Sequence, residues 1–335
     1  MKLETIISKI AQLEDVQNNP PVLVDVGASG ALIPQWKNIA YFSICIAFDA
    51  DDREFEFIEK ESKDFKKLFI FNRIVTDKLE KGTDEATFYL TKNPYCSSLL
   101  EPFDSKGDKM KNYYYADYFE VEKETILKAI TLNDALKQVE VPQIDWFKTD
   151  SQGIDLRLFT SLSKELQDKI LVAEFEPGFL DIYKGEDKII DVLQELNKNP
   201  LFFLTEFDVK RVVQLPQATF QELYPTKIKQ DAALNALRTI PAWSEMTYMN
   251  NLQTDKTPTK RDFVLAWLFS TIQNHHDLAY NYASQAKEKL SKETLNDNFF
   301  DVLQNHSYSE LENILASTKG AFQHFKYTVK KFLKG

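Results

Sequence analysis

The feature that most constrains the fold of this chain is a short apolar run that ends in an acid and a glycine turn. Residues 22–30 read Val-Leu-Val-Asp-Val-Gly-Ala-Ser-Gly, and a second apolar run over 43–48 closes on Asp49. Runs of this kind are typical of buried parallel strands. Gly27 and Gly30 allow a sharp turn that approaches a ligand closely, and a carboxylate after the second strand can accept hydrogen bonds from a ribose diol. The pattern therefore predicts a site for a nucleoside-containing cofactor.

The loop chemistry discriminates between two such cofactors. A dinucleotide site requires the spacing Gly-x-Gly-x-x-Gly, which lets a pyrophosphate lie on a helix N-terminus. Here the spacing is Gly27-Ala-Ser-Gly30, no third glycine follows, and Asp25 precedes the turn. An acid at this point would repel a pyrophosphate but suits an ammonium group. The loop therefore favours S-adenosylmethionine over NAD, while a tight turn without any ligand remains the alternative.

Composition excludes several classes of protein. The chain has 335 residues, of which 43% are hydrophobic, and its formal net charge is −10. Residues 223–335 carry 14 Lys and Arg against 11 Asp and Glu, so the first 222 residues hold 27 against 40. Such an acidic region argues against nucleic acid as a partner. No run approaches the length of a membrane span, and two cysteines provide no disulfide framework, so we expect a cytoplasmic protein.

Alternating apolar runs and helical spacings predict three parts. We expect an N-terminal helix in residues 1–19, a domain of alternating strands and helices over 20–222, and a helical extension over 223–335. Residues 68–75 are predicted as a strand, 86–91 and 113–121 as extra strands or an excursion from the sheet, and 201–207 with 209–215 as a closing antiparallel pair. A helix is predicted near 52–63, and another over 132–139 with Thr131 as its cap. The cluster of Trp243, Met246, Tyr248 and Met249 is predicted to pack the extension against the sheet, and the alternative is that it lines an acceptor pocket.

Further acids follow other predicted strands. Asp150 ends the run that starts at 144 and precedes a turn at Gly153, and Glu174 and Glu176 lie on one face near the end of the next strand. Ligands of open α/β sheets bind outside the carboxyl ends of the strands. We therefore expect Asp25, Asp49, Asp150 and Glu174 to converge on one crevice.

These segments together resemble the FkbM-type methyltransferases over residues 20–215. The resemblance rests on the order and spacing of Val24-Asp-Val-Gly-Ala-Ser-Gly30, Phe48-Asp-Ala-Asp51, Ser97-Ser-Leu99, Thr131-Leu-Asn-Asp134, Trp146-Phe-Lys-Thr-Asp-Ser-Gln-Gly153, Glu174-Phe-Glu-Pro177 and Tyr183-Lys-Gly-Glu-Asp-Lys with Asp191-Val. Asn133 departs from the acid that the family usually has, and Ser151 replaces a commoner Thr or Val. The last 110 or so residues are not covered.

The resemblance implies an α/β fold, a Rossmann-like seven-stranded methyltransferase sheet with helices on both faces, here followed by an all-helical extension. It implies O-methylation of a hydroxyl on a glycan or small natural product, with S-adenosyl-L-methionine as cofactor. The predicted cofactor-binding residues are Asp25, Gly27, Ala28, Ser29, Gly30, Asp49, Ala50 and Ser98. The predicted catalytic residues are Asp150, as base or acceptor-orienting group, and Glu174, which would hold the acceptor or support Asp150.

The histidines and the choice of acceptor leave other functions open. All four histidines follow residue 222, which leaves the carboxylates as candidate bases, and no Cys/His spacing predicts a metal. An N-methyltransferase and a non-catalytic binding or scaffold protein on the same fold are the alternatives, since a fold does not determine the acceptor. The helical extension is a candidate surface for homo-oligomerisation.

Overall fold

The computed structural model describes residues 1–27, 33–50, 64–107, 109–253, 258–291 and 298–332, and of 318–332 it describes the backbone alone. The chain forms two compact units. Residues 21–253 make up the sheet unit, and residues 1–20 with 254–335 make up the helical unit. The predicted helix near 52–63 lies outside the described residues.

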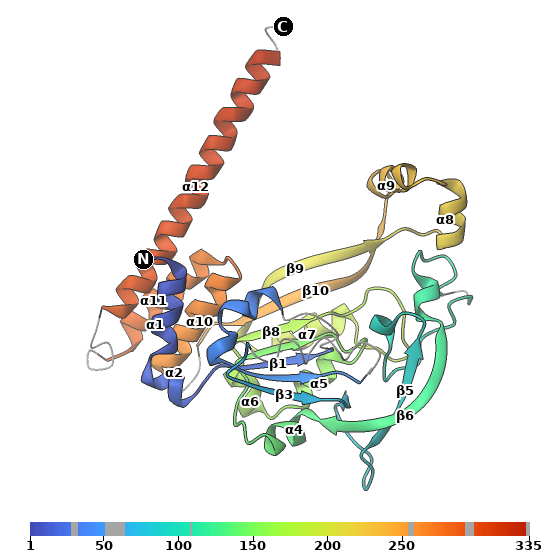
Figure 1. Cartoon of the computed structure of the whole chain (residues 1–335), viewed down its shortest axis with the longest axis horizontal. Helices are drawn as coiled ribbons and strands as arrows, with labels where there is room; N and C mark the ends of the chain where they lie inside the picture. The colour runs from blue at the N-terminus through green and yellow to red at the C-terminus, as the bar shows by residue number, and fades with distance from the viewer. Residues whose placement is uncertain (28–32, 51–63, 108, 254–257, 292–297, 333–335) are drawn as a thin grey trace. The chain divides into compact units, whose positions relative to one another are not determined.

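A seven-stranded, mostly parallel sheet is the centre of the sheet unit (Figure 1). Its strand order is β3-β2-β1-β7-β8-β10-β9, and β10 runs antiparallel to both of its neighbours. The strands are β1 (Val22–Val26), β2 (Ile44–Phe48), β3 (Lys67–Phe71), β7 (Trp146–Thr149), β8 (Val172–Phe175), β9 (Phe202–Val212) and β10 (Ile240–Asn250). The predicted Rossmann-like α/β class is confirmed at this level.

The two faces of this sheet are covered differently. Helices α4 (Leu132–Gln138), α5 (Asp155–Ser161) and α7 (Ile189–Lys198) pack on one face, and α6 (Lys164–Lys169) lies between α5 and β8 in the chain. Phe159 of α5 contacts Phe175 edge-on there, with ring centroids 5.4 Å apart. On the opposite face Trp36, from the 3-10 helix η1 (Pro34–Asn38), packs edge-on against Trp146 at 5.8 Å. The predicted cap at Thr131 is confirmed, because its side chain accepts a hydrogen bond from Asp134 N at 3.1 Å.

A smaller three-stranded sheet corrects two of the predicted strands. It has the order β4-β6-β5, from β4 (Ile74–Thr76), β6 (Val121–Thr131) and β5 (Glu85–Thr91). The run predicted over 68–75 is therefore two strands, β3 and β4, in different sheets. Of the two alternatives for 113–121, the strand is wrong, because 116–119 form the 3-10 helix η5 (Ala116–Phe119). The real strand β6 begins at 121 and is largely exposed over its first half, so its sequence lacks the apolar alternation of a buried strand.

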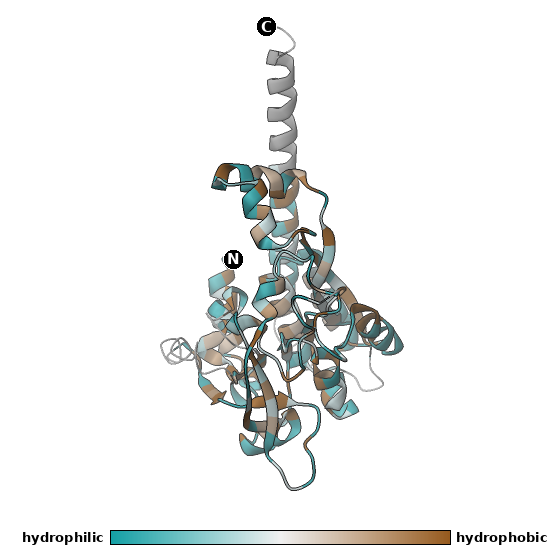
Figure 2. Ribbon diagram, turned by 90° about the vertical axis from the view of Figure 1, so that its right-hand side faces the viewer, coloured by the Kyte–Doolittle hydropathy of each residue, from teal (hydrophilic) through white to brown (hydrophobic). Residues whose placement is uncertain are grey.

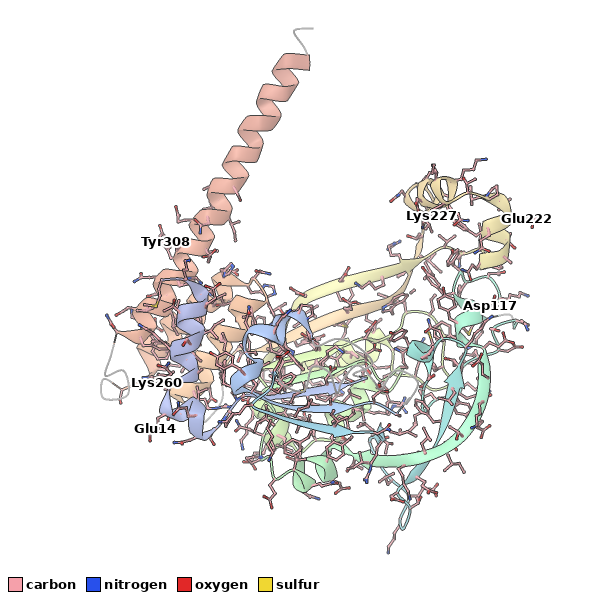
Figure 3. The ribbon with its side chains drawn as sticks, viewed as in Figure 1. Glu14, Asp117, Glu222, Lys227, Lys260 and Tyr308 are labelled. Carbon is pink, nitrogen blue, oxygen red and sulfur yellow. The ribbon has the colours of Figure 1, made fainter. Side chains whose placement is uncertain are left out.

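The end of the sheet unit also differs from the prediction. Residues 201–215 do not form an antiparallel pair, because β9 is one continuous strand whose partner is β10. Helices α8 (Gln217–Leu223) and α9 (Lys227–Ala236) connect the two strands, with Glu222 and Lys227 projecting outward (Figure 3). The predicted all-helical stretch from 223 onward is thus wrong over β10. Met246 and Tyr248, which we predicted to pack the extension against the sheet, instead lie two residues apart on β10 and are buried in the core of the sheet unit.

The helical unit joins both ends of the chain. It consists of α1 (Leu3–Ala11), α2 (Glu14–Asn18), α10 (Lys260–Ile272), α11 (His276–Lys289) and α12 (Phe299–Phe332). Residues 263–271 of α10 are all buried. Trp267 Nε1 donates to Ser307 Oγ at 2.9 Å, and Arg261 Nε donates to the Asn19 carbonyl at 2.7 Å. The single N-terminal helix predicted for 1–19 is therefore two helices, and they belong to a unit with its own core.

Hydrophobic and hydrophilic residues are interspersed along the helices (Figure 2). Among the described residues, no helix combines the length and the apolar character that crossing a bilayer requires.

Candidate functional site

Gly27 ends β1 in a conformation that other residues rarely adopt. Its φ is +81°, and its backbone nitrogen donates to the Phe48 carbonyl at 3.1 Å. A Cβ built on Gly27 would lie 2.2 Å from the carbonyl oxygen of Asp150. The close approach that we expected between this glycine and a ligand is therefore, in the structure, an approach to the backbone that follows β7. Ala28, Ser29 and Gly30 lie outside the described residues.

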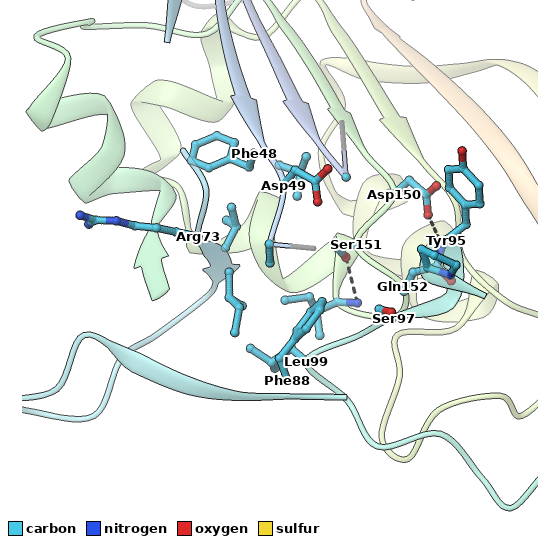
Figure 4. A pocket seen from close by; sticks show the side chains of 17 residues that line it. Phe48, Asp49, Arg73, Phe88, Tyr95, Ser97, Leu99, Asp150, Ser151 and Gln152 are labelled. Atoms are coloured by element: carbon cyan, nitrogen blue, oxygen red, sulfur yellow. Dashed lines mark hydrogen bonds between the residues drawn. The ribbon is translucent and has the colours of Figure 1, made fainter. Parts of the chain in front are cut away.

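A cavity opens beside Gly27 at the carboxyl ends of β1, β2 and β7, and we call it the glycine-turn cavity (Figure 4). Its walls include the predicted residues Asp49, Ala50 and Asp150, together with Arg73 and Tyr95. The remaining lining residues are Val26, Gly27, Phe48, Ile74, Val75, Phe88, Pro94, Ser97, Leu99, Ser151, Gln152 and Ile154. The described walls enclose about 80 Å³. Small-molecule pockets usually have volumes of about 300–1,000 Å³. Residues 28–32 and 51–63, which follow the lining residues Gly27 and Ala50 in the chain, lie outside the described residues.

Asp150 is held by a short hydrogen-bonded chain. The Gln152 amide nitrogen donates to Asp150 Oδ1 (Figure 4). Gln152 Oε1 in turn lies 2.8 Å from the Tyr183 hydroxyl. The same hydroxyl lies 2.8 Å from the Cys96 carbonyl oxygen. Burial raises the pKa of Asp150 to about 6, although the Lys148 charge and the Gln152 hydrogen bond lower it. Asp150 is therefore ionised at neutral pH, and its pKa lies close enough to that pH for the carboxylate to accept a proton from a substrate.

Ser98 has a structural place in this chain of contacts. Its side chain is buried, its hydroxyl donates to the Gln152 carbonyl at 2.7 Å, and it accepts from Leu100 N at 3.0 Å. The predicted contact of Ser98 with a cofactor is not supported, because Ser97 and Leu99 line the cavity on either side of it. Ser98 instead orients the backbone of Gln152, whose φ is +56°.

Asp155 is a further structural residue that the sequence analysis did not select. Its carboxylate is buried and accepts from Ser151 N at 2.8 Å, Thr149 Oγ1 at 3.1 Å and Glu176 N at 2.8 Å. Because Ser151 and Glu176 follow β7 and β8, one buried acid joins the turns after two neighbouring strands. The sequence signal for it is an acid in the first turn of a helix directly after a glycine turn.

A second cavity, the aromatic cavity, adjoins the first. It has a volume of about 320 Å³. Its lining residues are Asn93, Tyr95, Cys96, Met110, Tyr113, Tyr115, Ala116, Tyr118, Phe119, Asp150, Gln152, Gly153, Glu176, Gly178, Leu180, Ile182, Tyr183, Glu186, Val212, Ala242 and Trp243. Tyr95, Asp150 and Gln152 line both this cavity and the glycine-turn cavity.

A third cavity, the sheet-face cavity, has a volume of about 540 Å³ and contains the other two predicted acids. Asp25, Lys148 and Glu174 are register partners on β1, β7 and β8, so they stand side by side on one face of the sheet. Asp25 Oδ1 is 3.0 Å from Lys148 Nζ. Burial raises the pKa of Glu174 to about 7, and Lys148 lowers it. Although burial lowers the pKa of Lys148, the charges of Asp25 and Asp150 raise it above its usual range.

The predicted convergence of four acids on one crevice is therefore wrong in its detail. Asp49 and Asp150 line the glycine-turn cavity, whereas Asp25 and Glu174 line the sheet-face cavity. Glu176, which the predicted site did not include, lines both the aromatic and the sheet-face cavities. The reason is the alternation of side chains along a strand, since Asp25 and Glu174 still lie within their strands while Asp49 and Asp150 follow theirs.

None of the described residues that line the three cavities is a histidine. All four histidines follow residue 254 in the chain, and His276 and His306 belong to helices α11 and α12 of the helical unit. Within the described ranges, no group of three or more His, Cys, Asp or Glu side chains is placed to hold a metal ion.

Comparison of the chain with protein-family models, with curated proteins and with solved structures found no match.

Proposed function

We propose that the chain is an S-adenosylmethionine-dependent methyltransferase that transfers a methyl group to a hydroxyl of a glycan or a small natural product. The strand order supports this proposal. A dinucleotide-binding sheet of the doubly wound type is mostly parallel, and here β10, the last strand in the chain, runs antiparallel between β8 and the edge strand β9. An inserted antiparallel strand agrees with the methyltransferase sheet that the FkbM resemblance implies.

The observation that carries the proposal is the shared wall of two cavities. Asp150 and Gln152 border both the glycine-turn cavity and the aromatic cavity. A group-transfer enzyme requires such an arrangement, because donor and acceptor must meet at one point and enter from different sides. Asp49 lies in the glycine-turn cavity, where a carboxylate after the second strand can bind the ribose hydroxyls. We therefore assign the nucleoside to this cavity and the acceptor to the aromatic cavity.

S-adenosylmethionine, when bound, would supply an electrophilic methyl group on its sulfonium, and the sulfur would leave as a neutral thioether when the carbon–sulfur bond breaks. The protein has to hold the acceptor oxygen in line with the bond that breaks, and such positioning provides much of the rate gain. Asp150 accepts the hydroxyl proton as the oxygen forms its bond to the methyl carbon. Gln152, oriented by Tyr183 and Ser98, holds the Asp150 carboxylate toward the shared wall. Glu174 stands apart from this step, beside Lys148 in the sheet-face cavity.

Binding of S-adenosylhomocysteine to the full chain, followed by calorimetry, tests the proposal. Asp49→Ala removes two charge-assisted hydrogen bonds to the ribose, each worth about 1.5–3 kcal/mol, so the affinity is expected to fall about 100-fold or more. Asp84→Ala is the matched control, because Asp84 is exposed and paired with Lys128 on the small sheet. Equal affinity of the wild type and Asp49→Ala would overturn the assignment of the nucleoside to this cavity.

The alternatives predict different outcomes. A non-catalytic binding or scaffold protein would bind S-adenosylhomocysteine but transfer no methyl group to any acceptor. An N-methyltransferase would form a product whose new methyl lies on nitrogen, which fragmentation mass spectrometry distinguishes from an ether. Stronger binding of NADH than of S-adenosylhomocysteine would replace the proposal with an oxidoreductase.

A further inference from the structure

The aromatic cavity combines aromatic walls with negative charge. Among the described residues that line it are seven aromatic side chains, from Tyr95, Tyr113, Tyr115, Tyr118, Phe119, Tyr183 and Trp243. Three carboxylates share the lining, those of Asp150, Glu176 and Glu186, and none of the described lining residues is Lys, Arg or His.

The rings come from separate segments and pack against one another. Tyr115 and Tyr118, near η5, have ring centroids 5.2 Å apart, and Phe119 contacts Tyr183 edge-on at 5.7 Å. Trp243 comes from β10, on a different part of the fold. The face of an aromatic ring attracts a cation, and this attraction is strongest where the cation is removed from water.

The three carboxylates differ in what they already bind. Glu186 Oε1 accepts from Ile182 N at 2.8 Å and lies 2.6 Å from Lys188 Nζ, so its charge is compensated. Asp150 accepts from Gln152. In the part of the chain that the structure describes, the Glu176 carboxylate makes no hydrogen bond or ion pair. The backbone nitrogen of Glu176 donates to the Asp155 carboxylate. Since Asp150 is assigned to the acceptor hydroxyl and Glu186 is paired with Lys188, Glu176 is the described acid of this cavity left for a charged group of the acceptor.

The surroundings of Glu176 are predominantly acidic. Burial raises its pKa to about 9, and the charges of Asp150, Asp155 and Glu245 raise it further than Lys148 lowers it. At neutral pH the Glu176 carboxyl is therefore protonated until a positive charge arrives beside it. A neutral ligand would leave this group uncharged, and an anionic ligand would face Asp150 and Asp155 without compensation.

From these contacts we propose that the acceptor carries a protonated amine, which binds among the aromatic rings of the cavity and forms an ion pair with Glu176. The inference rests on the proposed function, since it specifies the acceptor class of the same site. It applies to an acceptor methylated on a hydroxyl, because the protonated nitrogen has no lone pair with which to attack a methyl group; an acceptor methylated on nitrogen would have to carry its positive charge on a different atom. When the amine binds, Glu176 ionises and releases one proton to the solvent.

Matched probes test the charge directly. The full chain is titrated with 2-phenylethylamine and with 2-phenylethanol, which has similar size and no charge, each at pH 7 in the presence of S-adenosylhomocysteine. We expect the amine to bind at least 10-fold more tightly, since a hydrogen bond to a charged group is worth a factor of about 10 or more. Calorimetry in two buffers of different ionisation enthalpy should show proton release with the amine alone.

Variants locate the effect in the cavity. Glu176→Gln keeps the shape of the protonated acid and is expected to abolish both the amine preference and the proton release. Glu101→Gln, an exposed acid paired with Lys184, should leave both unchanged. Tyr118→Leu provides a second variant, for which the removal of one ring should weaken amine binding about 2- to 30-fold. A preference that persists in Glu176→Gln and in Tyr118→Leu, or equal or absent binding of the two probes, overturns the inference.

The two proposals fail separately. If S-adenosylhomocysteine does not bind while the amine preference and its loss in Glu176→Gln are observed, the amine site stands and the methyltransferase proposal is overturned. If S-adenosylhomocysteine binds and the amine shows no preference, the acceptor inference is overturned and the nucleoside site stands.

Discussion

The substitution Gly27→Ala tests how the site is built more sharply than any change at a charged residue. Gly27 has a φ of +81°, and an added Cβ would lie 2.2 Å from the Asp150 carbonyl oxygen. A left-handed backbone costs a residue other than glycine about 1–2 kcal/mol. The overlap adds about 1–3 kcal/mol, because the turns after β1 and β7 must move apart within a packed sheet. We therefore expect the free energy of unfolding to fall by about 2–5 kcal/mol in total.

Two other glycines separate these contributions. Gly82 has a φ of +90° and Gly185 a φ of +74°, and a Cβ on either would meet no atom within 4 Å. Gly82→Ala and Gly185→Ala should therefore lose about 1–2 kcal/mol, which is the conformational part alone. The difference between Gly27→Ala and these two controls is the energy of the contact with Asp150.

Urea unfolding of the full chain, followed by tryptophan fluorescence, measures these free energies. Trp36, Trp146 and Trp243 belong to the sheet unit, so the signal reports mainly on that unit. An equal loss of stability in Gly27→Ala and Gly82→Ala would refute the reasoning, because it would mean that the backbone of Asp150 does not pass close to Gly27. A movement of Asp150 should also weaken binding of S-adenosylhomocysteine in Gly27→Ala, with no change in Gly82→Ala.

Three further predictions concern the acids. Asp150→Asn should lower turnover about 10²–10⁴-fold, as removal of a general base does, with little change in the affinity for S-adenosylhomocysteine; an equal loss of both would make Asp150 a cofactor ligand. Asp155→Asn should lower the free energy of unfolding by about 1–3 kcal/mol, because the NH₂ group of the introduced asparagine would face a backbone N–H that in the wild type donates to the carboxylate. Urea unfolding measures this change, and Asp84→Asn is the exposed control. Raised pKa values of Asp150 (about 6), Glu174 (about 7) and Glu176 (about 9) mean that the folded state holds protons which the unfolded state has released, so stability should fall as the pH rises from about 4 to 9. Glu176→Gln should flatten the part of this decline between about pH 7 and 9, and an unchanged slope in urea unfolding would contradict the pKa of Glu176.

The elements that could be predicted from the sequence are those with a buried, uniform environment. β1, β2, β7 and β8 are short apolar runs because both faces of a parallel sheet are covered. Helices α4, α5 and α7 have apolar residues at helical spacing and pack on one face of the same sheet. In each case local pattern and tertiary environment agree, so the prediction required no knowledge of distant residues.

The elements that were missed depend on partners far away in the chain. β6 is mostly exposed and rich in charge, and its pairing with β5 supplies the strand conformation. The sequence pattern divides β9 at Asp208, which in the structure pairs with Glu245 across the sheet and forms an ion pair with Lys210. β10 falls within a stretch predicted to be helical, because its burial is created by β8 and β9 rather than by its own periodicity. The joining of the first 20 residues to the last helices is likewise a property of packing and leaves no local pattern.

The register of the sheet changes the reason why the glycine turn would accept S-adenosylmethionine. From the sequence, the negative charge of Asp25 is expected to exclude a pyrophosphate and to attract an ammonium group. In the structure Lys148 is the register partner of Asp25 and lies 3.0 Å from it, so this charge is neutralised within the sheet-face cavity. The acids that give the glycine-turn cavity its charge are Asp49 and Asp150, which follow their strands and are therefore free of the alternation that turns Asp25 away. The affinity for a cationic cofactor should accordingly depend on Asp49 and Asp150 and should be unchanged in Asp25→Asn. A loss of affinity in Asp25→Asn as large as that in Asp49→Ala would show that the charge of Asp25 does act on the cofactor and that the two cavities act as one site.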